Sequence, residues 1–147
     1  MYKADDIANW FIVHGVDDVG FYGGEYVTPL KLQKLLYYAQ GCHGVLKGMK
    51  LFDEDFYHWT YGPAIPEIYD LYKKHGDHGI ERPSRTVSID DETRAVLNEV
   101  YKVFGKFSAW ALCEMTHEEA PWKNTKMGEV IPYANIIEYF SKEVVEK

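Results

Sequence analysis

The chain has 147 residues, enough for one domain with a real core, and its 46% hydrophobic and 16% aromatic content argues against disorder. The formal net charge of −7 opposes binding to nucleic acid or to an anionic membrane, and it suits either a basic partner or plain solubility. Two lone cysteines, Cys42 and Cys113, the lack of a long apolar run and an N-terminus without a signal-like apolar centre lead us to expect a cytoplasmic protein with reduced thiols.

The first predicted helix starts at Asp5 and Asp6, whose charges favour a helix N-terminus. Apolar residues then follow at helical spacing up to His14, and Gly15 is expected to end the helix. Residues 16–26 contain three glycines and are predicted to form a loop.

A second, longer helix is predicted from Thr28-Pro29, which combines a capping hydroxyl with proline in the first turn. It should run to Gly48, a residue suited to a helix C-terminus. Two glycines inside it, Gly41 and Gly44, are unfavourable for a helix, so we interpret them as positions where another helix comes close. The alternative is that the helix ends earlier.

A short β-ribbon is expected beyond this helix. Residues 56–61 alternate in the manner of a strand, and Arg85 to Ile89 form a second β-prone run. We expect these two runs to pair beside the helices.

Four further helices follow from spacing and capping residues, of which Asp90 and Ser108 are the clearest N-caps. Residues 116–126 are predicted to be irregular, with Pro121-Trp122 as a turn anchor. Val103 is expected to point inward. The fold class is therefore mainly α, or α+β in detail: one domain over residues 1–147, with about six helices and a short ribbon. The four helices are predicted at residues 65–75, 91–104, 109–115 and 132–144.

Enzyme motifs are weak. His117-Glu118-Glu119-Ala120 begins like a zinc-protease helix but lacks the second histidine that such a site needs at i+4. His75 and His78 lie three apart, yet the polar, glycine-containing loop around them explains their presence. We predict no catalytic residue, no cofactor and no metal. A metal-dependent enzyme that uses His75, His78 or His117 is retained as an alternative from another class.

Lysines do not favour nucleic-acid binding either. Lys31, Lys34 and Lys47 lie on the long helix, and we interpret them as an ordinary solvated charged face.

The most informative segment is Trp59-Thr60-Tyr61-Gly62-Pro63-Ala64-Ile65-Pro66-Glu67-Ile68-Tyr69. Two prolines three residues apart fix two φ angles and remove two backbone donors, so the segment is a rigid turn that carries rings. Rigid aromatics either pin a core or present a docking surface, and the sequence leaves both open. The predicted partner-binding residues are Trp59, Tyr61, Gly62, Pro63 and Tyr69.

Three blocks of the sequence resemble the Panacea domain of the SocA-like antitoxin family, which includes phage-associated GepA-like proteins. They are residues 30–40 (LKLQKLLYYAQ), residues 51–54 (LFDE) and the 59–69 segment itself. Residues 105–110 and 116–122 are also similar to that family. The resemblance covers nearly the whole chain in order and spacing.

The resemblance implies a non-enzymatic, mostly helical antitoxin that binds and neutralises a cognate protein toxin, encoded by an adjacent gene. An alternative within the family is a proteolytic adaptor, which delivers the bound toxin to an ATP-dependent protease. Family toxins have diverse folds, so the resemblance does not name the toxin. It also brings no DNA-binding module.

Overall fold

The computed structural model describes residues 1–22 and 25–145. Its described residues form seven α-helices and one two-stranded antiparallel ribbon, which confirms the mainly α prediction. The α-helix α7 continues directly into a π-helical turn at Phe140–Val144, and α3 into a 3₁₀ turn at Lys73–His75. The elements are α1 (Ala4–Tyr22), α2 (Pro29–Lys47), β1 (Tyr57–Trp59), β2 (Gly62–Ala64), α3 (Pro66–Tyr72), α4 (Asp91–Phe104), α5 (Ala109–His117), α6 (Ala120–Lys123) and α7 (Tyr133–Tyr139).

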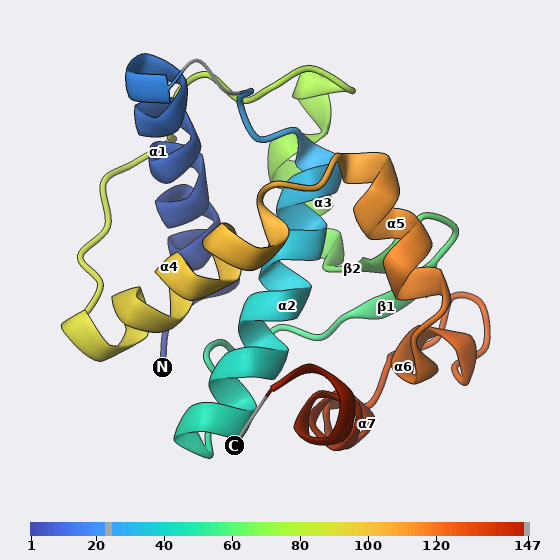
Figure 1. The fold of residues 1–147 in the computed structure, drawn as a ribbon. Coiled ribbons are helices and arrows are strands. Elements are labelled where there is room, and N and C mark those ends of the chain that lie inside the picture. The colour runs from blue at the N-terminus through green and yellow to red at the C-terminus, as the bar shows by residue number, and fades with distance from the viewer. Residues whose placement is uncertain (23–24, 146–147) are drawn as a thin grey trace.

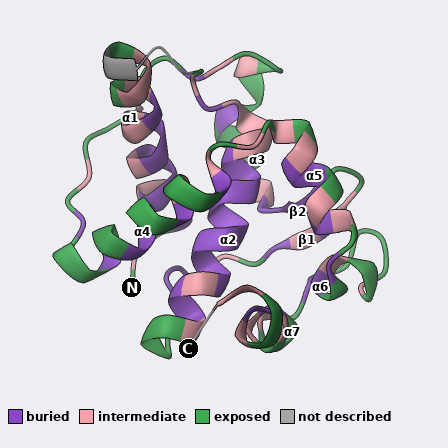
Figure 2. Ribbon diagram, in the orientation of Figure 1, coloured by how far each residue is buried: buried purple, intermediate pink, exposed green. Residues whose placement is uncertain are grey.

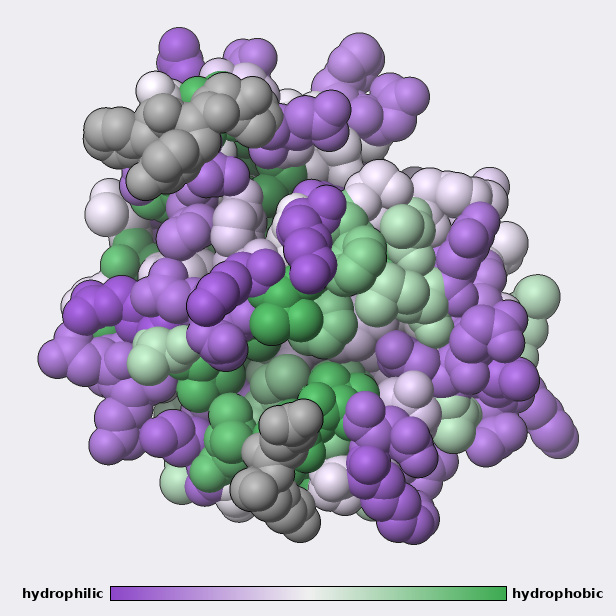
Figure 3. Space-filling model, viewed as in Figure 1, coloured by the Kyte–Doolittle hydropathy of each residue, from purple (hydrophilic) through white to green (hydrophobic). Residues whose placement is uncertain are grey.

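Helix α2 occupies the centre of the fold (Figure 1). Helices α1 and α4 lie on one side of it, α5, α6 and the ribbon on the other, and α7 lies near its C-terminal end. Every residue from Leu32 to Gly41 is buried, and Figure 2 shows this stretch in the buried colour. Figure 3 shows hydrophobic residues in the middle of one face, around α2, with hydrophilic residues toward the edge.

The ends of α2 form as predicted. The Thr28 hydroxyl accepts a hydrogen bond from the Lys31 amide at 3.2 Å, and Pro29 lies in the first turn. Gly48 ends the helix in the left-handed region, with φ of 72°. The helix therefore reaches Gly48 and does not stop earlier.

Both glycines inside α2 are sites of close helix approach, as the sequence indicated. A Cβ at Gly41 would lie 2.3 Å from the ring of Phe140, and one at Gly44 would lie 2.3 Å from the Ile137 Cδ1 atom. Such distances are far below van der Waals contact, so α7 and its π-helical extension pack here only because no side chain intervenes. The packing outweighs the helix propensity that glycine forfeits.

Two glutamines of α2 bind backbone from other parts of the chain. Gln33 donates to the Ile65 carbonyl at 3.0 Å and accepts from the Ile65 amide at 2.8 Å. Gln40, two turns further along the same face, donates to the Phe52 carbonyl at 2.7 Å and accepts from the Leu51 amide at 2.9 Å. The two glutamine side chains therefore supply hydrogen-bond partners to buried backbone groups that lie outside any sheet. They fix the segments before and after the ribbon to the central helix.

The prediction that the first helix ends at Gly15 is wrong, because α1 continues to Tyr22. A Cβ at Gly15 would lie 2.9 Å from the Val27 Cγ2 atom, so the glycine serves packing against the returning chain. The loop predicted at 16–26 is correspondingly shorter, and its glycines 23 and 24 lie outside the described residues.

The predicted strand pairing is also wrong. The antiparallel partner of β1 is β2, with Trp59 opposite Gly62, and residues 85–89 form no strand. Side chains of α1 instead bond the start of that segment: Asn9 Oδ1 accepts from the Ser84 amide at 2.9 Å and from the Arg85 amide at 3.4 Å, and the Arg85 guanidinium pairs with Asp6. A backbone amide that is bonded to a helix side chain is not available to a ladder.

Two smaller expectations also fail. Residues 116–126, expected to be irregular, contain the short helix α6, and Pro121 lies in its first turn. Val103, expected to point inward, is 42% exposed. The N-caps of α4 and α5 are confirmed: Asp90 accepts from the Thr93 amide at 2.9 Å and Ser108 from the Ala111 amide at 3.0 Å.

Candidate partner-binding cleft

The aromatic turn connects β1 to β2. Thr60 and Tyr61 form the two-residue connection, and Gly62 follows with φ of 107°, a conformation that glycine adopts readily. Pro63 faces His58, whose amide donates to the Glu129 carbonyl at 2.9 Å instead of to β2. The missing N–H of the proline therefore leaves no gap in the ladder.

Side chains from the α5–α6 region hold this turn. The Trp122 indole donates to the Trp59 carbonyl at 2.9 Å, and the Thr60 carbonyl lies 3.0 Å from His117 Nε2. The Trp122 ring stacks between two imidazoles, with centroid distances of 4.0 Å to His58 and 4.2 Å to His117. Consecutive carbonyls of the turn are thus bonded to rings that are themselves packed, which makes the turn rigid.

The five predicted partner-binding residues divide into two groups. Gly62 and Pro63 are buried, whereas Tyr61 is 56% exposed and Tyr69 is 49% exposed. Trp59 is half-buried and meets Tyr69 edge to face, with ring centroids 5.4 Å apart. The backbone of the turn is therefore core, and its rings form a surface.

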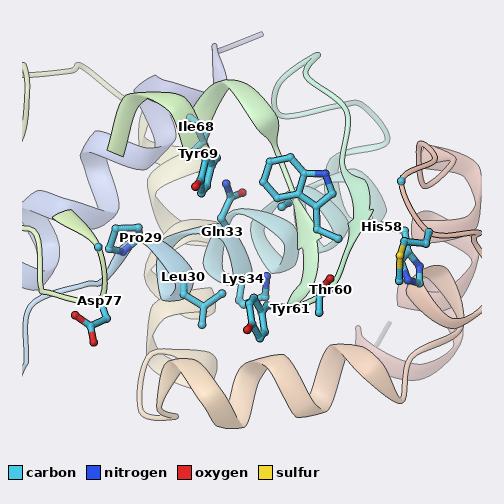
Figure 4. A pocket seen from close by; sticks show the side chains of 16 residues that line it. Pro29, Leu30, Gln33, Lys34, His58, Thr60, Tyr61, Ile68, Tyr69 and Asp77 are labelled. Atoms are coloured by element: carbon cyan, nitrogen blue, oxygen red, sulfur yellow. The ribbon is translucent and has the colours of Figure 1, made fainter. Parts of the chain in front are cut away.

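The exposed rings border a cleft of about 630 Å³. It is bounded by the first turns of α2, the ribbon, α3 and the turn that follows it (Figure 4). Its size falls in the ~300–1,000 Å³ range of ordinary ligand sites. Trp59, Tyr61, Gly62 and Tyr69 line it, but Pro63 does not. Other lining residues include Pro29, Leu30, Gln33, Lys34, Ile68, Asp77 and Met127.

Lys34 lies at the bottom of this cleft and is only 1% exposed. Its ammonium donates to the Pro63 carbonyl at 2.9 Å. Burial lowers the pKa of Lys34 to about 8, because the low-dielectric surroundings disfavour the charged form. In Figure 4 the Lys34 nitrogen lies between Gln33 and Tyr61.

The interpretation of Lys34 as part of a solvated face is therefore wrong. Helical spacing could have revealed it, since the apolar Leu30 and Tyr38 lie one turn before and after it on the same face of the helix. Lys31 is also engaged, because its ammonium donates to the Gly105 carbonyl, at the end of α4, at 2.6 Å. This contact suits the negative end of a helix.

The histidines considered for a metal-dependent enzyme make different contacts. His117 bonds and stacks as described above, and the exposed His78 lies 3.7 Å from Asp77. Over residues 1–22 and 25–145, no group of three or more His, Cys, Asp or Glu side chains is placed to hold a metal ion. Helices in the same ranges are too short or too polar to cross a bilayer.

Fold and site together define a small helical domain with a rigid, ring-bordered cleft. Comparison with known proteins identifies the family. The model for "Antitoxin SocA-like, Panacea domain" matches residues 32–123, more than half of the chain, and the chain belongs to this family. The match includes Lys34, the aromatic turn and Trp122.

One curated relative is Antitoxin SocA of Caulobacter vibrioides (strain NA1000 / CB15N), which is 29% identical over 113 residues. The alignment covers 65% of this chain and 58% of that relative, so the chain spans less than two thirds of the relative's length. No solved structure matches the chain.

Proposed function

We propose that this chain is an antitoxin that neutralises a cognate protein toxin by docking it over the aromatic cleft. The observation that carries the proposal is the combination of exposed Tyr61 and Tyr69 with a turn whose consecutive carbonyls, at residues 59 and 60, are bonded to packed rings. Rings that are already ordered lose little entropy on binding, and aromatic anchors of this kind dominate interface energetics. Family membership and the name of the SocA relative support the class of partner.

Charge supports the same partner. An excess of seven acidic charges raises the association rate with a basic protein surface and disfavours nucleic acid. The proposed action is stoichiometric occlusion, without chemistry on the toxin. The partner is the product of a gene adjacent to the one that encodes this chain.

The test is co-expression with the neighbouring gene product, scored by growth. Wild-type protein is expected to restore growth to cells that express the toxin. Tyr61→Ala combined with Tyr69→Ala should abolish the rescue, because two exposed anchors are lost while the core is untouched. Leu46→Ala is the matched control, since Leu46 is an equally exposed apolar residue (55%) outside the cleft.

A toxic neighbour that this protein does not neutralise would refute the proposal, as would rescue by the double variant. The half-life of the toxin in the same cells separates docking from delivery to a protease. Docking leaves the half-life unchanged, whereas an adaptor shortens it.

A further inference from the structure

The ammonium of Lys34 is a buried charge without an anion. Among the described residues, the acceptor it meets is the Pro63 carbonyl, and no carboxylate lies within ion-pair distance of it. An ammonium has three N–H donors, so the protein leaves donor capacity unused. A buried charge without a partner destabilises the fold, which makes its position on the cleft floor informative.

Gly62 leaves the space that the ammonium occupies. A Cβ there would lie 3.2 Å from the Lys34 Nζ atom and 2.9 Å from its Cε atom. The lysine head is also held by the 2.9 Å bond to Pro63, so its position is fixed. The cleft therefore has an apolar, ring-bordered mouth and a single preset cation at its floor.

The cleft does not offer an edge for strand addition. Pro63 has no N–H, and its carbonyl is bonded to Lys34. Gln33 occupies both the amide and the carbonyl of Ile65, the next residue along that edge. An extended peptide could not pair with β2 here, so an occupant is recognised by its side chain and its charged end.

We propose that this cleft binds the free C-terminal carboxylate of the partner polypeptide, with the carboxylate on Lys34 and the last, apolar side chain between Leu30, Tyr61 and Tyr69. One cation matches one monoanion better than a phosphate dianion. The apolar lining suits an apolar terminal side chain, and Asp77 at the cleft disfavours a second negative charge nearby. This inference rests on the proposed docking of a toxin and names the part of the toxin that enters the cleft.

The test uses purified protein and no toxin. The probes are four fluorescein-labelled hexapeptides, Gly-Ser-Gly-Ala-Ala-X, in which X is Leu, Ile, Phe or Trp, each as free acid and as C-terminal amide. Fluorescence anisotropy is expected to show at least one free acid binding about tenfold or more tightly than its amide, since a charge-assisted hydrogen bond is lost in the amide. Lys34→Met should remove this preference, and Lys31→Met, a bonded lysine on the same helix outside the cleft, should keep it.

The acid–amide comparison in the wild-type protein needs no variant, so misfolding of Lys34→Met would not obscure the result. The proposal is overturned if no free acid binds better than its amide, or if Lys34→Met folds and retains the preference. An amidated peptide ending in Glu that binds as tightly as the free acids would also overturn it, in favour of an acidic side chain. Acid-selective binding together with failed toxin rescue would refute only the docking function, and rescue without acid selectivity would refute only this inference.

Discussion

Glu119 is a residue at which pH and stability should be strongly linked. Its side chain is 7% exposed, and its two carboxylate oxygens accept hydrogen bonds from Tyr37 at 3.0 Å and Tyr38 at 2.8 Å. Burial raises the pKa of this carboxyl from its ordinary 4.5 to about 7, and the two tyrosine hydroxyls oppose that rise only partly. Replacing it with glutamine removes the titration and keeps the shape.

The magnitude follows from linkage. Because the pKa is higher in the folded protein, the folded state holds the proton more tightly than the unfolded chain does. The contribution of Glu119 to stability is therefore greatest below pH 4.5 and decreases as the pH rises toward about 7, above which it stays level. At ~1.4 kcal/mol per pKa unit, the loss from this one group is about 3 kcal/mol.

The assay is urea denaturation of wild type and Glu119→Gln at four pH values from 4.5 to 7.5. Other carboxylates titrate in both proteins, so the difference in unfolding free energy isolates Glu119. We expect the unfolding free energy of the variant, relative to that of wild type, to rise by about 3 kcal/mol between pH 4.5 and pH 7.5. Glu118→Gln, at the exposed neighbouring residue, controls for the loss of one net charge.

A difference that is flat with pH, or that changes in the opposite direction, would refute the reasoning. Tyr38→Phe provides a second check. It removes a donor that favours the carboxylate, so it should cost about 1.5–3 kcal/mol at pH 7.5 and less at pH 4.5, where the folded protein carries a neutral acid.

The other predictions concern packing and backbone. Leu35→Ala, at a fully buried position of α2, should lower the unfolding free energy by about 2–5 kcal/mol in urea denaturation, and a native-like midpoint would contradict its place in the core. Gly41→Ala should destabilise the fold by about 1–3 kcal/mol through the clash with Phe140, although alanine is the better helix former. Gly20→Ala in α1 should instead stabilise the fold by about 0.4–1 kcal/mol, because no atom lies near the new Cβ. Gly62→Val should lower the melting temperature clearly, since φ of 107° and a Thr116 Oγ1 atom 2.6 Å from the new Cβ both oppose a side chain; an unchanged melting curve would show that the turn can relax.

Local signals were enough for much of the helical framework. A hydroxyl before a proline marked the start of α2, and Gly48 marked its end, because caps depend on residues within one turn. Gly41 and Gly44 could be interpreted as close contacts since glycine inside a strong helix otherwise costs stability. The two prolines of the 59–69 segment predicted a rigid turn. In the structure, this segment contains the turn that connects β1 to β2.

What the sequence could not determine depends on residues far apart in the chain. The end of the first helix was misplaced because Gly15 packs against Val27 and does not cap. The 85–89 segment was misassigned because the Oδ1 atom of Asn9, 76 residues earlier, accepts a hydrogen bond from the Arg85 amide.

The burial of polar side chains in and near the cleft also depends on residues far apart in the chain. Lys34 is buried at a position where its ammonium meets the Pro63 carbonyl, 29 residues away in the chain. Glu119 acquires its raised pKa only through burial in the assembled core, where it accepts hydrogen bonds from Tyr37 and Tyr38, more than 80 residues earlier. Chain-local propensities set where α2 and most other helices begin and end, whereas burial of polar groups is a property of the assembled core, because only tertiary contacts remove water from them.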